Sequence, residues 1–240
     1  MMTKIHVVVP AAGSGRRMQS AVPKQYLTLS GESVLSHTLK RLLAALPALS
    51  TLTVALSPGD EQGRALLRQL ASDYPGKTIT TAPGGAERSD SVLNALDALR
   101  DVAGDQDWVL VHDAARPCVR GDDIARMMVV LSETPDVDGG LLAAPVAATL
   151  KRSDSEDCIM ETVDRQQVWA AATPQTFRYH ALRQALLKAN EHEISVTDEA
   201  SAMEAVGAKI KLIPCQPDNI KITWQGDIAM AEAILKSQQP

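Results

Sequence analysis

Short apolar runs alternate with longer amphipathic segments through the first 145 residues, and this alternation constrains the fold more than any other feature. The apolar runs that end in polar or glycine-containing sequence are predicted to be strands, at residues 5–9, 52–57, 77–81, 108–112 and 141–145. The segments between them place apolar residues at helical spacing, at residues 34–46, 64–73, 91–100 and 122–132. Such alternation predicts an α/β fold in which helices sandwich a mostly parallel sheet.

Residues 147–172 break this rhythm, because two short strand-like segments, 147–152 and 161–165, flank a polar run. We interpret this region as a projecting β-arm. It is too small for a core of its own and must therefore lie on this subunit or on another. The remaining elements are predicted to be two helices, a strand and a closing helix, at residues 181–190, 198–206, 209–213 and 226–236. Residues 1–240 are thus expected to form one domain with an arm.

The composition excludes several classes of protein. A chain of 240 residues with 45% hydrophobic residues can bury a sizeable core, so disorder is not expected. A formal net charge of -5 opposes nucleic-acid binding, which needs a broad basic surface. The three cysteines, Cys118, Cys158 and Cys215, form no Cys-x-x-Cys pair and indicate reduced thiols rather than disulfides or zinc ligands. No apolar run approaches the ~20 residues of a membrane span, so we expect a cytoplasmic protein.

The run PAAGSGRRM at residues 10–18 follows the first predicted strand. Glycines there let backbone N–H groups approach an anion closely. The run is neither a dinucleotide fingerprint, since Met18 stands where the third glycine belongs, nor a Walker loop, which requires Gly-Lys-Ser/Thr. Arg16, Arg17 and Lys24 place three cations within nine positions, which suits a triphosphate. A tight turn with solvated arginines is the alternative interpretation.

The run VLVHDAARP at residues 109–117 ends another predicted strand. A carboxylate there, Asp113, is suitably placed to hold a divalent metal that bridges phosphates, and Arg116 could bind a second anion. Asp113 could instead simply cap the turn.

Two other runs are less specific. The run GGAERSDS at residues 84–91 opens a helix, where N–H groups and hydroxyls could bind a base or ribose, although Ser89 or Ser91 could equally be a plain N-cap. The run DNIKIT at residues 218–223 would in isolation be taken for a surface loop.

Taken in order, these motifs resemble the 2-C-methyl-D-erythritol 4-phosphate cytidylyltransferases of the non-mevalonate isoprenoid pathway. The matching runs are PAAGSGRRM (10–18), PKQY (23–26), HDAARP (112–117), TVDR (162–165), ATPQ (172–175), TDEA (197–200) and DNIKIT (218–223). The resemblance spans residue 8 to about residue 233. It implies a homodimeric nucleotidyltransferase with a Rossmann-like, glycosyltransferase-A-type sheet, whose arm crosses to the partner and helps to complete its substrate site.

The resemblance also implies roles for individual residues. Those expected around the CTP phosphates are Pro10, Ala11, Ala12, Gly13, Ser14, Gly15, Arg17 and Lys24. Those expected at the cytidine are Gly85, Ala86 and Ser91. Asp113 would serve Mg2+, or another divalent cation, and the hydroxyls of the sugar phosphate. Arg116, Thr173 and Lys221 would lie around that substrate, and Thr149 and Arg165 would reach in from the partner. The residues with catalytic roles would be Arg17, Lys24, Asp113 and Lys221.

The chain departs from the family pattern at two places. Ala86 replaces an aspartate found in some relatives, and Trp224-Gln225 stands where an Arg-Pro pair is expected. A cytidylyltransferase for another polyol phosphate, such as ribitol 5-phosphate, is the nearest alternative. An inactive nucleotide-binding protein is a remote one, since the cations expected to stabilise the transition state are present.

Overall fold

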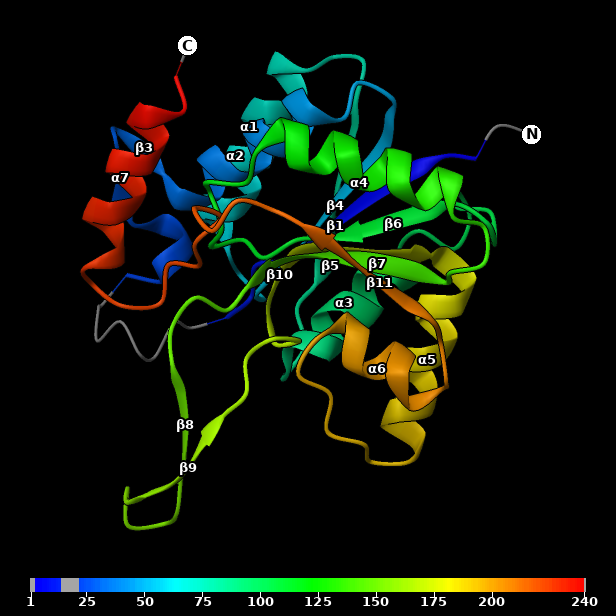
Figure 1. Ribbon diagram of the computed structural model, residues 1–240. Coiled ribbons are helices and arrows are strands. Elements are labelled where there is room, and N and C mark those ends of the chain that lie inside the picture. The colour runs from blue at the N-terminus through cyan, green and yellow to red at the C-terminus, as the bar shows by residue number, and fades with distance from the viewer. Residues whose placement is uncertain (1–2, 14–21, 240) are drawn as a thin grey trace.

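The computed structural model describes residues 3–13 and 22–239. Its centre is a seven-stranded sheet in the order β11-β7-β10-β6-β1-β4-β5 (Figure 1). The strands are β1 (Ile5–Pro10), β4 (Leu49–Leu56), β5 (Thr78–Pro83), β6 (Trp108–Val111), β7 (Gly139–Pro145), β10 (Trp169–Arg178) and β11 (Ile210–Pro214). Only the pairings of β10 with β6 and β7 are antiparallel among these described strands. The sheet is therefore mostly parallel, as predicted.

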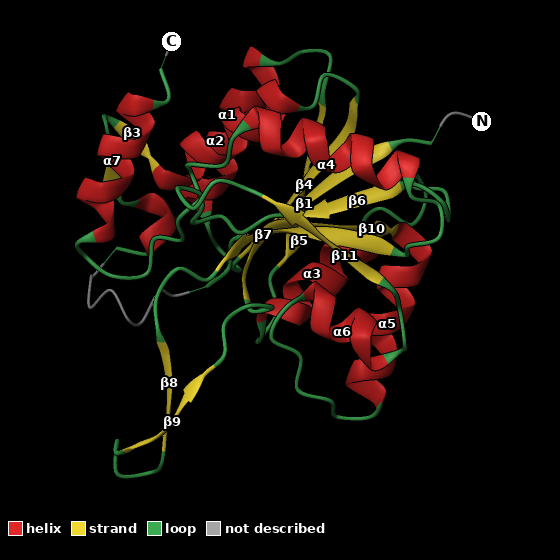
Figure 2. Cartoon of the chain, viewed as in Figure 1, coloured by secondary structure: helices red, strands yellow, loops and turns green. Residues whose placement is uncertain are grey.

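Helices cover both faces of the sheet, and Figure 2 shows the yellow strands between two layers of red helices. One layer consists of α1 (Val34–Ala45), α2 (Glu61–Asp73) and α4 (Gly121–Glu133). The other consists of α3 (Arg88–Asp97), α5 (Tyr179–Glu191) and α6 (Glu199–Ala205). Alternate residues of β1 enter the two cores, because successive side chains of a strand point to opposite faces. The predicted fold class is confirmed.

A third, smaller apolar cluster lies to one side of the sheet. Here α7 (Asp227–Ser237) packs beside the short hairpin of β2 (Thr28–Leu29) and β3 (Glu32–Ser33). The cluster also contains Ile222, so α7 supports the segment that carries Lys221. No helix in residues 3–13 and 22–239 combines the length and apolar character needed to cross a bilayer.

The sequence interpretation missed β10 and the β2–β3 hairpin. Pro174 lies inside β10, and proline inside an apolar run is normally taken as evidence against a strand. The pairing of β10 with β7 is irregular between Ala171 and Gln175, which accommodates this proline. Residues 169–172 were predicted to belong to the arm but lie in the central sheet. The hairpin strands, at two residues each, are too short to show a period.

The arm therefore occupies residues 146–168, between β7 and β10. Its paired strands are β8 (Leu150–Ser153) and β9 (Ile159–Val163), and Figure 1 shows them projecting from the body. Ile159 and Met160 are each 66% exposed on β9. The arm thus presents apolar side chains that this subunit does not cover.

Candidate active site

A pocket of about 170 Å³ lies at the carboxyl ends of β1, β5 and β6. The three loops that follow these strands meet there, together with the segment around Lys221. Ten of the predicted site residues line it: Pro10, Ala11, Ala12, Gly13, Lys24, Gly85, Ala86, Ser91, Asp113 and Lys221. Asp113 and Lys221, predicted to bind the sugar phosphate, therefore share one cavity with eight of the residues predicted to bind CTP.

The first loop is held by side chains from neighbouring segments. The Nε2 atom of the buried Gln25 donates to the carbonyl oxygen of Ala11 at 2.8 Å. Next to it, Lys24 Nζ donates to the carbonyl oxygen of Ile222 at 3.2 Å, which links the first loop to the Lys221 segment. The predicted residues Ser14, Gly15, Arg16 and Arg17 lie outside the described residues.

The loop after β5 is shaped by the start of α3. The helix begins at Arg88, three residues before the predicted start, because Glu87 and Asp90 form a capping box. Ser91 is therefore not the N-cap. Its Oγ atom instead accepts a hydrogen bond of 3.0 Å from the backbone N–H of Gly85, which holds the loop against the helix beside the pocket.

Asp113 follows β6 and is almost fully buried, with 7% of its surface exposed. Its Oδ1 atom lies 3.0 Å from Arg88 Nε, and its Oδ2 atom lies 2.9 Å from Lys221 Nζ and 3.3 Å from Arg116 Nε. Burial alone would raise the pKa of this carboxyl group. The charges of Arg88, Lys221 and Arg116 outweigh burial and hold the pKa of Asp113 far below its usual range. Asp113 is thus ionised at neutral pH.

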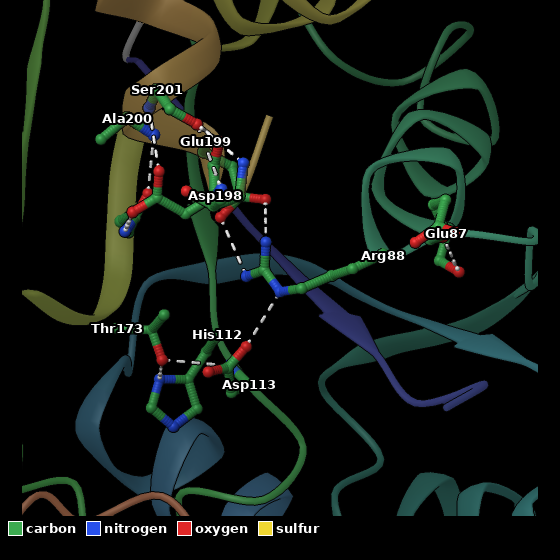
Figure 3. Close-up of polar contacts among 12 residues, drawn as sticks. Glu87, Arg88, His112, Asp113, Thr173, Asp198, Glu199, Ala200 and Ser201 are labelled. Carbon is green, nitrogen blue, oxygen red and sulfur yellow. Dashed lines mark hydrogen bonds and ion pairs between the residues drawn. The ribbon is translucent and has the colours of Figure 1, made fainter. Parts of the chain in front are cut away.

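Thr173 does not line the pocket, but its side-chain oxygen contacts both Asp113 and His112 (Figure 3). The backbone N–H of Asp113 donates to Thr173 Oγ1 at 3.1 Å, and the same oxygen lies 3.0 Å from Nδ1 of the buried His112. His112 Nε2 lies 3.1 Å from the carbonyl oxygen of Arg116, which can only accept. Burial lowers the pKa of His112 to about 4, so the ring is neutral at pH 7.

These contacts fix the direction of every hydrogen bond in the group. The proton of the neutral His112 ring must be on Nε2, where it is donated to the carbonyl of Arg116. His112 Nδ1 is then an acceptor, and the hydroxyl proton of Thr173 is donated to it. The oxygen of Thr173 already accepts from Asp113, so this hydroxyl has at most one lone pair left for a substrate.

Two charged residues that are linked to Asp113, Arg88 and Glu199, were not identified from the sequence. Arg88 lines the pocket, and its Nη1 and Nη2 atoms donate to the two carboxylate oxygens of Glu199 at 2.6 and 3.0 Å. Glu199 is 1% exposed. Both residues stood inside motifs that had been singled out. Their pairing was not visible because 111 positions separate them and nothing in either motif indicates the other.

The predicted arm residues Thr149 and Arg165 are exposed and do not line the pocket of their own subunit. Arg165 Nη1 donates to the backbone carbonyl of Ala147, within the arm. Their reach into a partner's site stays a prediction.

The residues of the pocket can be tested for their fit to Mg2+. Magnesium is usually bound by one or two carboxylates together with substrate phosphates. A carboxylate has about four acceptor positions, and Arg88, Arg116 and Lys221 use three on Asp113. No cluster of three or more potential metal-ligating side chains exists among the described residues. Asp113 therefore fits a cation that is bound mainly by the phosphates of a nucleotide.

Comparisons with known proteins agree with this geometry. The family model of 2-C-methyl-D-erythritol 4-phosphate cytidylyltransferase matches residues 5–237. The enzyme of that name from Hahella chejuensis is 48% identical over 97% of this chain and 93% of its own. The one from Escherichia coli O127:H6 is 46% identical over 95% and 92%.

Solved structures give the same result. The cytidylyltransferase structure from Francisella tularensis superposes with a TM-score of 0.77 at 32% identity, covering 97% of this chain and 100% of that one. The structure from Thermus thermophilus gives a TM-score of 0.73 at 29% identity, covering 95% and 98%. Because the family model spans residues 5–237 and relatives at 46–48% identity cover nearly the whole chain, the chain belongs to the 2-C-methyl-D-erythritol 4-phosphate cytidylyltransferase family.

Proposed function

We propose that this protein transfers CMP from CTP to 2-C-methyl-D-erythritol 4-phosphate, giving 4-diphosphocytidyl-2-C-methyl-D-erythritol and pyrophosphate for isoprenoid precursor synthesis. One observation carries the proposal beyond family membership. The two loops predicted to bind the nucleotide and the Asp113–Lys221 ion pair predicted to bind the sugar phosphate line a single pocket. A nucleotide and a second phosphorylated substrate could therefore meet there.

The chemistry requires little acid–base catalysis. A phosphate monoester has a second pKa of about 6 and is mostly dianionic at neutral pH, so its oxygen can attack the α-phosphorus of CTP without a general base. Pyrophosphate leaves in line with the attack. The main obstacle is the repulsion between two anions, which the ammonium groups of Lys24 and Lys221 in the pocket would reduce.

Asp113 has a different role in this proposal. An ionised carboxylate cannot protonate the substrate, but the acceptor position that Arg88, Arg116 and Lys221 leave open can accept a hydrogen bond from a hydroxyl of a polyol. Its low pKa ensures that it does so throughout the neutral range. When bound, Mg2+ would neutralise negative charge on the triphosphate, and the open acceptor position of Asp113 could offer it an oxygen in place of a hydroxyl.

The homodimer is part of the proposal. The arm leaves the body with Ile159 and Met160 exposed, and we propose that a second copy of the chain covers them. A second copy that accepts the arm would bury these side chains and bring Thr149 and Arg165 to a pocket. A cytoplasmic location is also proposed, and the three free cysteines agree with a reducing compartment.

The test is pyrophosphate release by the purified protein with CTP and Mg2+, with either 2-C-methyl-D-erythritol 4-phosphate or ribitol 5-phosphate as acceptor. We expect rapid release with the first acceptor alone, loss of activity with a chelator, and recovery on adding Mg2+. Release with ribitol 5-phosphate instead would keep the chemistry but change the substrate. CTP binding without release with either acceptor would indicate an inactive nucleotide-binding protein.

A further inference from the structure

The contact between Arg88 and Glu199 joins two helix starts beside the active site. Arg88 is the first residue of α3, and Glu199 is the first residue of α6. The guanidinium group donates from Nη1 and Nη2 to the two oxygens of Glu199 and from Nε to Oδ1 of Asp113. Figure 3 shows Arg88 between the two carboxylates. One side chain therefore connects Glu199, α3 and Asp113.

The burial of Glu199 needs an explanation. A buried carboxylate loses its hydration, and a buried ion pair is often no more stable than apolar residues of similar volume. Glu199 does not line the pocket, and both of its oxygens accept from Arg88. Glu199 therefore acts on the orientation of the Arg88 guanidinium group. Two parallel hydrogen bonds fix the plane of that group, whereas a single one would not.

The fixed plane has a consequence for Asp113. Arg116 and Lys221 both approach Oδ2, whereas Arg88 donates to Oδ1. Donors on both oxygens define the rotation of the carboxylate about its Cβ–Cγ bond. Without Arg88, the two cations at Oδ2 would remain, but no donor at Oδ1 would fix the rotation of the carboxylate.

We propose that Arg88 and Glu199 act as a positioning pair for Asp113, and that Arg88 is not one of the cations that bind substrate phosphates. The proposal rests on the proposed function, in which Asp113 binds the acceptor substrate. The charge of Arg88 is balanced by Glu199, so removing both side chains leaves the net charge around the pocket unchanged. This makes the pair separable from Lys24 and Lys221.

The experiment compares Arg88→Met, Glu199→Leu and the double variant. Each single variant leaves a buried charge without its partner and is expected to lose stability, whereas the double variant removes both charges and is expected to regain it. Turnover should not recover with stability. In the folded double variant we expect kcat to fall about 10- to 100-fold through misplacement of Asp113, with the Kd for CTP changed by less than about threefold.

A second measurement asks whether the effect runs through Asp113. Residues that act as a unit are not additive, so the double variant should cost little further activity in an Asp113→Asn background. The crystal structure of the double variant gives a readout that does not depend on turnover. The carboxylate of Asp113 should be rotated about its Cβ–Cγ bond away from its wild-type orientation, because no donor remains at Oδ1. Arg88→Lys, which keeps the charge but loses the planar fork, should lower kcat in the same direction.

Arg183→Met is the matched control. Arg183 of α5 pairs with Asp97 at the other end of α3, with Nε 2.8 Å from Oδ1, and it does not line the pocket. Its loss should leave kcat unchanged. Wild-type turnover in the double variant, or an additive loss in the Asp113→Asn background, would overturn the proposal. So would a large loss of CTP affinity with kcat unchanged. A wild-type protein that releases no pyrophosphate would refute the proposed function instead, and the orientation of the Asp113 carboxylate in the double variant would still decide the positioning proposal.

Discussion

At the scale of single residues, the sequence identified Thr173 but not what surrounds it. The family resemblance implied that Thr173 lies near the acceptor substrate. The structure shows that its hydroxyl donates to His112 and accepts from the backbone of Asp113. His112 is next to Asp113 in the sequence, yet its hydrogen-bond partner Thr173 is 61 positions away. Sequence spacing carries no information on such a contact, because β10 brings the two residues together only in the folded sheet.

Thr173→Val tests this arrangement. Valine keeps the shape of threonine but leaves His112 Nδ1 and the N–H of Asp113 buried without a partner, which costs about 1–3 kcal/mol for each unsatisfied group. We expect a lower melting temperature and a fall in kcat of at least about tenfold, whereas Thr173→Ser keeps both bonds and should stay within a few-fold of wild type.

Nitrogen NMR of His112 provides the independent check. Since burial lowers the pKa of this ring to about 4, the neutral Nε2–H form should persist across the neutral range. A proton found on Nδ1 would reverse the hydrogen bond between His112 and Thr173 and would leave Nε2 with no proton to donate to the carbonyl oxygen of Arg116, whereas the N–H of Asp113 would still donate to Thr173.

At the scale of elements, the sequence correctly predicted those strands and helices that a local apolar pattern determines. The parallel strands, the principal helices and the meeting of loops at the carboxyl ends of the strands all follow from apolar periodicity and sheet topology. β10 was missed because Pro174 interrupts it and its partners are distant in sequence. The start of α3 was placed late because Glu87, rather than serine, caps it. Because the helix was placed three residues too late, the sequence did not show that Arg88 is the first residue of α3.

The close approach of two of these loops gives a prediction at the same scale. A Cβ atom at Gly84 would lie 2.1 Å from Cβ of Ala12 and 3.2 Å from the carbonyl oxygen of Leu56. Gly84→Ala should therefore push the loop after β5 away from the loop after β1 and lower CTP affinity by about tenfold or more. Calorimetry with CTP measures this. Gly76→Ala, where a Cβ meets nothing within 4 Å, is the control and should bind CTP normally. Equal affinity in both variants would show that the nucleotide does not need this approach.

At the scale of the whole molecule, the arm carries two residues that the family resemblance places at the substrate. Figure 1 shows it projecting away from the sheet, and neither Thr149 nor Arg165 lines the pocket of its own subunit. An arm that served its own site would have to fold back onto the body. An arm that serves a partner can stay extended, and it would bury Ile159 and Met160 in doing so. The second arrangement requires less rearrangement of the described structure.

Mixing two inactive variants distinguishes the two arrangements. Lys24→Ala should lower turnover about 10²- to 10³-fold, the range for loss of one preorganised donor. Arg165→Ala should be similarly impaired if this residue reaches a substrate. In a mixed dimer, the body with intact Lys24 would receive the arm with intact Arg165, so one site of two would be complete. After denaturation and joint refolding of equal amounts, about half of the dimers are mixed, and about a quarter of wild-type activity should return. Each variant refolded alone is the control. Recovery requires that the arm cross between subunits, whereas an arm that completes its own pocket predicts none, since every subunit would then carry one defect in its own site.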